Sequence, residues 1–340
     1  METIRVKTNS GRSRILIGER LKNLQRYIPV KKPIIITDVN VGKLYPLDSM
    51  AAEVITIGAG ESNKTLDTAQ EIYAQLLSLQ ADRSSYIVGM GGGIVCDIAG
   101  FVASTFLRGV RFGFVATTLL AQVDASVGGK NGVNFNGYKN MVGLIRQPEF
   151  VICDLELLKT LPHKEIACGL AEIVKHGAIA DAELFAYTEQ HAEDILTLDR
   201  QAIEKLVLAS VRIKSSIVSR DENEKGERRL LNFGHTFGHA IEKVTGISHG
   251  EAVSRGMAIA AALSVKKGLL TADEDKRLRA LLNNLKLPTD FGFESKAVLK
   301  AIGKDKKREG NWIHFVLLNG IGSATAEKIT LEELEDAIHG

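Results

Sequence analysis

The chain has 340 residues, 45% of them hydrophobic and 25% charged, which is usual for a globular enzyme of one or two domains. Its 43 basic and 41 acidic residues are interspersed and nearly cancel, so the composition argues against a nucleic-acid or membrane partner. The three cysteines are widely spaced and form no CxxC pair, and the first residues lack an apolar signal core. We therefore expect a cytoplasmic protein with reduced thiols.

The first 158 residues alternate short β-branched runs with helical patterns, which is typical of an α/β fold with a parallel sheet. The expected strands lie at 33–38, 53–58, 85–91, 112–118 and 150–155. From residue 159 amphipathic stretches dominate, and the expected helices lie at 163–179, 199–219, 229–244, 250–268 and 272–285, with a late strand at 312–318. We predict a Rossmann-like nucleotide-binding domain at 1–158 and a mainly helical domain at 159–340.

One polar stretch, RDENEKGERR at 220–229, is expected to be a solvated loop, although its last arginines are candidates for a functional role.

A glycine cluster follows the expected strand at 85–91 and opens a helix, in the string GGGIVCDIAGF. Backbone amides at such a helix start can bind a pyrophosphate, because glycine allows close approach and the helix dipole favours an anion. The strict GxGxxG fingerprint is absent, since position 94 is Ile, and a simple tight turn is the alternative. A second loop places Lys130 after two glycines, but Asp124 and Asn131 stand where a Walker A motif needs Gly and Ser or Thr.

Three short segments carry side chains that can bind a metal: Glu172 in GLAEIVKH, His235 and His239 in FGHTFGHA, and His249 in HGEAVSRGM. One carboxylate and two or three imidazoles match the ligand count of an open catalytic zinc-type site. The histidines four residues apart share one helix face. Thr236 follows the first of them where a zincin peptidase has Glu, so that class is disfavoured. Separate structural roles for the histidines are the alternative.

Cations accompany these motifs without forming a basic patch: Lys130, Lys139, Lys175, Lys214, Arg228 and the run DKKR at 305–308. They indicate a small substrate with more than one negative charge, although a surface lysine is solvent-facing by default. On spacing alone, His176, four residues after Glu172, is a rival metal ligand.

Several long strings occur here in the order found in 3-dehydroquinate synthases, which the chain resembles from TDVNVG at 37–42 to NGIG at 319–322. They are GGGIVCDIAGFVAST, TTLLAQVDASVGGKNGVN, GYKNMVG, GLAEIVKH, RRLLNFGHTFGHAIE, HGEAVSRGM and DKKREGNWIHFVLL. The confusable relatives are other sugar phosphate cyclases and, more distantly, glycerol dehydrogenases of similar two-domain fold. The resemblance implies a homodimer with its active site in the cleft between the two domains.

The same resemblance implies roles for individual residues. Glu172, His235 and His249 would bind a divalent metal, usually zinc and alternatively cobalt, with His239 a nearby polar group. The NAD+ site would involve Asp38, Asn40, Glu61, Lys64, Gly92, Gly93, Asp97, Thr117, Thr118, Asp124, Lys139, Thr160 and Glu165. The catalytic and substrate-binding set would be Asp124, Lys130, Asn140, Lys175, Lys214, Arg228, Asn232, His239 and either Lys306 or Lys307, with Arg108 reaching in from a second subunit.

The activity implied is conversion of the keto acid phosphate 3-deoxy-D-arabino-heptulosonate 7-phosphate to 3-dehydroquinate and phosphate, a carbon–oxygen lyase step of the shikimate pathway to aromatic amino acids. NAD+ would take and return one hydride, so that oxidation, phosphate elimination, reduction and aldol closure use the cofactor catalytically. The alternatives are another sugar phosphate cyclase, a metal-dependent NAD polyol dehydrogenase, which needs fewer anion-binding groups, and an inactive NAD-binding regulator.

Overall fold

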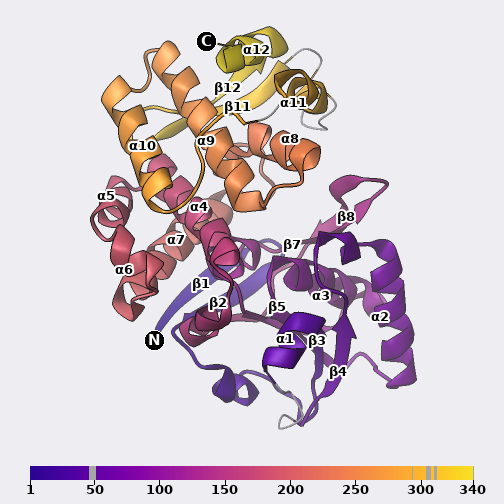
Figure 1. Ribbon diagram of the computed structural model, residues 1–340. Coiled ribbons are helices and arrows are strands. Elements are labelled where there is room, and N and C mark those ends of the chain that lie inside the picture. Colours follow the sequence, from indigo (N-terminus) through magenta and orange to yellow (C-terminus); the bar gives the residue numbers. More distant parts are fainter. Residues whose placement is uncertain (46–50, 293, 304–307, 310–311, 340) are drawn as a thin grey trace. The chain divides into compact units, whose positions relative to one another are not determined.

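The computed structural model describes residues 1–45, 51–292, 294–303, 308–309 and 312–339, which form two compact units (Figure 1). The first unit comprises Met1–Leu161 and Lys214–Glu222, and the second comprises Pro162–Ile213 and the described residues from Asn223 onward. The long helix α7 (Arg200–Arg220) therefore contributes residues to both units.

A seven-stranded sheet is the centre of the first unit, in the order β1-β2-β9-β6-β5-β3-β4. All neighbouring strands run parallel except the β1–β2 hairpin. The expected parallel sheet is confirmed, whereas the antiparallel hairpin at the start of the chain was not predicted. The strands are β1 (Glu2–Thr8), β2 (Gly11–Ile17), β3 (Ile34–Asp38), β4 (Glu53–Ile57), β5 (Tyr86–Gly91), β6 (Arg111–Ala116) and β9 (Phe150–Cys153).

The inner strands are buried on both faces, which is why they appear in the sequence as continuous apolar runs. Every residue of β5 is buried, and Ile35, Val88, Val115 and Ile152 from four neighbouring strands belong to one apolar core. Helix α3 (Gly93–Thr105) packs on β5 and β6. The other helical segments of this unit are η1 (Leu21–Arg26), α1 (Val39–Leu44), η3 (Glu61–Asn63), α2 (Leu66–Ser78), η4 (Phe106–Arg108), the π-helical turn η5 (Ala121–Ala125) and η6 (Leu155–Thr160).

A separate hairpin in the first unit pairs β7 (Lys130–Phe135) with β8 (Tyr138–Ile145). Contacts of β7 with α3 and α2 fix the hairpin beside the glycine-initiated helix. It therefore brings a second polar loop to that part of the unit.

The second unit is mainly helical, as expected, with a small antiparallel sheet of β10 (Arg308–Glu309), β11 (Trp312–Leu318) and β12 (Ala324–Thr330). Its helical elements are α4 (His163–Ala180), α5 (Ala182–Gln190), α6 (Ala192–Leu196), η7 (Glu227–Asn232), α8 (His235–Thr245), α9 (His249–Lys266), α10 (Ala272–Asn284), α11 (Ser295–Ile302) and α12 (Leu331–His339). Helix α9 packs against α8, α4, α10 and β11 and forms the middle of the unit.

Two local expectations were wrong. The helix expected at 229–244 is a 3₁₀ turn, η7, followed by α8, because Gly234 adopts φ +76° and ends the first segment before the second begins. The stretch 220–229 is not a fully solvated loop, since Glu222 and Arg228 are only 8% and 3% exposed.

Hydrogen bonds of the Glu222 carboxylate connect residues 214–222 to the rest of the first unit. Its carboxylate accepts hydrogen bonds from the backbone amides of Asn9 at 3.0 Å and Ser10 at 3.2 Å, in the β1–β2 turn, and from the Ser10 hydroxyl. Gln147 Nε2 lies 3.5 Å from the same carboxylate. The end of α7 is thus tied to the first sheet.

Among the described residues, no helix combines the length and apolar character that crossing a bilayer requires.

Candidate functional site

The second unit brings three predicted metal ligands together. Glu172 lies in the middle of α4, and His235 and His249 are the first residues of α8 and α9. One donor atom of each lies within 4.8 Å of the others, and the Nε2 atoms of both histidines are 3.4 Å from Glu172 Oε1. Two histidines, 63 and 77 residues after Glu172 in the chain, therefore converge on one buried carboxylate.

The spacing fits a tetrahedral metal ion. Ligand bonds of about 2.1 Å at tetrahedral angles would place neighbouring donor atoms about 3.4 Å apart. The two nitrogen-to-oxygen distances in the structure, both 3.4 Å, agree with that value. Two imidazoles and one carboxylate are the ligands of several catalytic zinc sites, which leave the fourth position for a substrate or water. The donor set therefore suits zinc or a similar divalent ion.

The second ring nitrogen of each histidine also has a partner. His235 Nδ1 lies 3.1 Å from the carbonyl oxygen of Phe233, and His249 Nδ1 lies 3.5 Å from Glu242 Oε2. Such contacts fix an Nδ1–H tautomer and leave Nε2 as the metal donor.

The two imidazoles differ in their affinity for a proton. Burial and the neighbouring Lys175 lower the pKa of His235 to about 3, against the attraction of Glu172. Burial also opposes the charge on His249, but hydrogen bonds and charges from Glu172 and Glu242 outweigh it and raise its pKa to about 9. In the protein without metal, His235 is thus the neutral member of the pair.

Small residues allow the three helices to approach. A Cβ atom at Gly250, next to His249, would lie 2.5 Å from Cα of Cys168 on α4. The backbone amide of Gly250 donates to the Cys168 sulfur at 3.4 Å. Cys168 precedes Glu172 by one helical turn, so this close packing sets the separation of the carboxylate from His249.

Other predicted residues of the second unit surround this group. Lys175 is buried and forms an ion pair with Glu172 Oε2, and the His239 ring centroid lies 5.2 Å from that of His235. His176, the rival ligand, is fully buried on α4. Asn232 donates to Glu224 at 2.5 Å.

The remaining residues that were predicted for the site in the second unit lie in different settings. Arg228 is buried on η7, and Glu165 is exposed in the first turn of α4. Lys306 and Lys307 lie outside the described residues.

Several residues predicted for the nucleotide site lie at the carboxyl ends of adjacent parallel strands in the first unit. Asp38 ends β3, Gly92 follows β5, and Thr117 follows β6. These strands are neighbours in the sheet, and dinucleotides bind beyond the carboxyl ends of such strands. Asp38 also caps α1 by accepting from the amide of Asn40 at 2.8 Å.

The beginning of α3 has the features of an anion site. Its N-cap is Gly92, which offers no side-chain cap for the first amides of the helix. A Cβ atom at Gly92 would be 3.0 Å from Thr118 Cγ2, and one at Gly93 would be 2.9 Å from Cβ of Ala125. Thr117 Oγ1 is buried and has no hydrogen-bond partner among the described residues. Buried hydroxyls usually have one, so the residues present fit a bound dinucleotide.

Lys64 is the centre of a polar network in the first unit. It is 4% exposed, forms an ion pair with Asp97, and donates to Asn140 Oδ1 at 2.6 Å. Lys139 Nζ lies 3.9 Å from Glu61 Oε1. Residues predicted for nucleotide binding are thereby brought beside Asn140, which was predicted for the substrate.

Asn134 joins this network and was not predicted. Its amide group donates to Glu61 Oε1 at 2.8 Å and its Oδ1 accepts from the backbone amide of Asn140 at 2.9 Å. Asn140 has φ +53°, so these bonds hold it in an uncommon conformation. A polar residue of a hairpin carries no periodic signal, so the sequence offered little to identify it.

The remaining predicted residues of the first unit lie around these elements. Lys214 donates to Asp124 Oδ1 at 2.6 Å, and Thr160 Oγ1 lies 2.8 Å from the Tyr45 hydroxyl. Lys130 is exposed at the start of β7. Arg108 is exposed in a turn where Leu107 and Arg108 both have positive φ.

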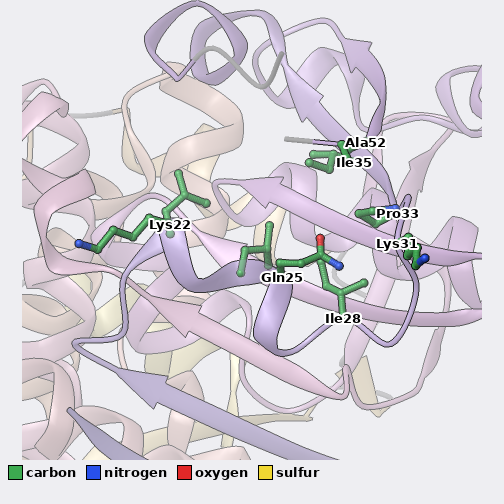
Figure 2. Close-up of a pocket in the computed structure, with 10 residues that line it drawn as sticks. Lys22, Gln25, Ile28, Lys31, Pro33, Ile35 and Ala52 are labelled. Atoms are coloured by element: carbon green, nitrogen blue, oxygen red, sulfur yellow. The ribbon is translucent and has the colours of Figure 1, made fainter. Parts of the chain in front are cut away.

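A cavity of about 390 Å³ lies elsewhere in the first unit, at the amino end of β3, opposite to the strand ends just described (Figure 2). None of the predicted site residues lines it. Its lining combines apolar and basic side chains: Leu21, Lys22, Leu24, Gln25, Ile28, Lys31, Pro33, Ile35, Ala51 and Ala52.

Comparisons with known proteins identify relatives over most of the chain. Residues 54–168 match the family described as 3-dehydroquinate synthase N-terminal, and residues 169–308 match 3-dehydroquinate synthase C-terminal. A 3-dehydroquinate synthase from Geobacter metallireducens is 44% identical over 89% of this chain and 87% of its own length.

Two solved structures have the same fold. A 2-deoxy-scyllo-inosose synthase with carbaglucose-6-phosphate, NAD+ and Co²⁺ is 26% identical, with a TM-score of 0.90 over 99% of both chains. A 2-epi-5-epi-valiolone synthase from Streptomyces hygroscopicus with NAD+ and Zn²⁺ is 28% identical, with a TM-score of 0.89 over 100% of this chain and 98% of its own.

Proposed function

This chain belongs to the 3-dehydroquinate synthase family, and we propose that it converts 3-deoxy-D-arabino-heptulosonate 7-phosphate to 3-dehydroquinate and inorganic phosphate. The observation that carries the proposal is the convergence of Glu172, His235 and His249 at tetrahedral spacing. The reaction is a phosphate elimination, so the enzyme is a carbon–oxygen lyase of the shikimate pathway to aromatic amino acids.

The resident cofactors are NAD+ and a divalent metal, zinc in preference to cobalt. When bound, they supply reversible hydride transfer and polarisation of the substrate oxygen. With the metal bound, both imidazoles would be neutral and would hold it together with Glu172, and Lys175 limits the negative charge of the buried carboxylate. Support for NAD+ comes from the start of α3, which has no side-chain cap, and from the Thr117 hydroxyl, which has no hydrogen-bond partner in the part of the chain that the structure describes.

We assign the nucleotide to a set of residues whose first-unit members lie at strand ends or in the Lys64 network, except for Asp124, which accepts from Lys214, and Thr160, which lies beside Tyr45. Glu165 is the member of this set from the second unit. The set is Asp38, Asn40, Glu61, Lys64, Gly92, Gly93, Asp97, Thr117, Thr118, Asp124, Lys139, Thr160 and Glu165.

The substrate carries a carboxylate and a phosphate, and we assign its binding to cations and hydrogen-bonding groups. A buried guanidinium can hold a carboxylate through two parallel hydrogen bonds, and for this Arg228 is the candidate. Lys214 holds the Asp124 carboxylate in place. The full set is Asp124, Lys130, Asn140, Lys175, Lys214, Arg228, Asn232 and His239, with Lys306 or Lys307 outside the described residues.

We also propose that the enzyme is a cytoplasmic homodimer and that Arg108 acts in the partner's active site. The strained turn supports this role, because Leu107 and Arg108 at φ +51° and +68° present the guanidinium on the surface at a conformational cost. The three cysteines are free, which suits a reducing compartment.

Phosphate release from the keto acid phosphate, measured with and without NAD+, tests the proposed function. We expect release that depends on NAD+ and on the metal, with no net change in NADH absorbance, because the hydride returns to the same molecule. Stoichiometric NADH formation from a polyol would instead identify a dehydrogenase. Preference for a sugar phosphate without a carboxylate would identify another cyclase.

A further inference from the structure

We infer that Glu242 is a positioning residue that orients His249 for metal binding, an inference that rests on the proposed metal site. Glu242 lies on α8 seven residues after His235 and three after His239. Residues at these spacings share one helix face, so α8 directs a ligand, a neighbouring imidazole and a carboxylate to the same side.

The contacts of His249 are the main support. Its Nε2 faces Glu172 Oε1 at 3.4 Å, and its Nδ1 faces Glu242 Oε2 at 3.5 Å. The imidazole is thus held between two carboxylates, one on α4 and one on α8. Only the first belongs to the proposed ligand set, and the second faces the Nδ1 side of the ring.

The Nδ1 atoms of the two histidines face different kinds of acceptor. Phe233 precedes α8, and its carbonyl fixes His235 Nδ1 through the backbone. His249 is the first residue of α9, its side chain is 26% exposed, and its Nδ1 partner is a side chain. A carboxylate that accepts from Nδ1 would hold the ring and its tautomer and make Nε2 a stronger donor.

The charge of Glu242 adds to this effect. Its side chain is 16% exposed, so solvent screens its attraction to a nearby divalent ion only in part. Loss of this carboxylate should therefore weaken metal binding through orientation and through charge. The isosteric glutamine retains an acceptor oxygen and removes only the charge, whereas alanine removes both.

The test is the Zn²⁺ dissociation constant, measured by chelator competition on the full chain without NAD+ or substrate. We expect Glu242→Ala to raise this constant about 10- to 100-fold, and Glu242→Gln to raise it by less. The absorption spectrum of the Co²⁺-loaded protein reports ligand geometry and should change in Glu242→Ala. Asp273→Asn, which removes an exposed carboxylate of the same unit, is the control and should bind like the parent.

The unfolding midpoints of the metal-free proteins show whether a variant binds zinc more weakly because His249 is misoriented or because the whole fold is destabilised. Similar midpoints for parent and variants, together with weaker zinc binding, support the inference. An unchanged dissociation constant in both Glu242 variants overturns it, even if His249→Ala abolishes binding and the metal site stands. If His249→Ala binds zinc like the parent, the proposed metal site fails and the inference fails with it. Should Glu242→Ala not fold, the glutamine variant decides.

Discussion

Gly256 on α9 lies so close to Gly234 that a Cβ atom at position 256 would be 1.9 Å from the Gly234 carbonyl oxygen. Gly234 has φ +76° and directly precedes His235, the first residue of α8. The crossing of α8 and α9 at this point therefore fixes the start of α8, where His235, a proposed metal ligand, lies.

We expect Gly256→Ala to lower the free energy of unfolding by about 1–3 kcal/mol, because α8 and α9 must separate to admit the methyl group. The displaced His235 should also bind zinc more weakly. Denaturant unfolding and zinc titration measure the two effects. Gly42→Ala is the control, since its added Cβ would meet only Thr37 Cγ2 at 3.7 Å. A fully stable Gly256→Ala variant would contradict the close packing.

Removal of one metal ligand should abolish metal binding without unfolding the chain. In His249→Ala, Glu172 and His235 are too few donors for tight binding. We expect loss of bound zinc by elemental analysis and loss of phosphate release, with an unchanged circular dichroism spectrum. His163→Ala removes an exposed imidazole from the first residue of α4 and should retain full metal content.

Arg228→Lys tests recognition of the substrate carboxylate. Lysine cannot reproduce the planar guanidinium fork, and truncation of a buried charge-assisted contact costs about 2–5 kcal/mol. We expect kcat/KM for the keto acid phosphate to fall well over tenfold, with NAD+ affinity and metal content nearly unchanged. The matched control is Arg229→Lys, because Arg229 lies 3.2 Å from His314 and has no proposed substrate contact. Equal losses in both variants would argue against a specific role.

Glu222 should make stability depend on acidic pH. Burial acts to raise the pKa of this carboxyl, but hydrogen bonds from Ser10, Thr8 and Gln147 outweigh it, and the folded-state pKa is lowered. A lowered pKa stabilises the fold above the unfolded value of about 4.3, and the contribution disappears as pH falls through the folded value. The parent should therefore lose this contribution only in acid.

The corresponding variant is Glu222→Gln. We expect it to be less stable than the parent by about 1–3 kcal/mol at pH 7, with the difference shrinking below about pH 4.5. Urea unfolding at several pH values measures it. Glu71→Gln changes an exposed carboxyl on α2 and should match the parent throughout. A constant difference at every pH would show that the charge of Glu222 is not responsible.

The sequence predicted the buried strands well, because β5 and β6 must be apolar on both faces and leave a clear signal. It did not predict the β1–β2 hairpin. Charged residues such as Arg5, Lys7 and Arg14 interrupt these strands. Val6 is the one buried residue of β1, and β2 is buried without interruption only over 15–17, so neither strand forms a long apolar run. The end of η7 was also missed, because a single glycine does not reveal its own φ before the fold is known.

Spacing gave several metal-ligand candidates, and the family resemblance selected three of them. Their convergence depends on α4, α8 and α9 packing together, which no local pattern encodes. Glu242 escaped notice for a related reason: a glutamate late in an amphipathic helix usually faces solvent. Only its distance to His249 distinguishes it.

The three proposed metal donors all come from the second unit, whereas the proposed nucleotide residues, apart from Glu165, come from the first. Loading of the two cofactors should therefore be separable in time. A newly folded chain can acquire its metal before any dinucleotide arrives, and damage confined to the glycine turn at Gly92 should leave a fully metallated but inactive protein. Metal content should therefore report whether the second unit has folded and bound its ion, and it should not report whether the enzyme is active.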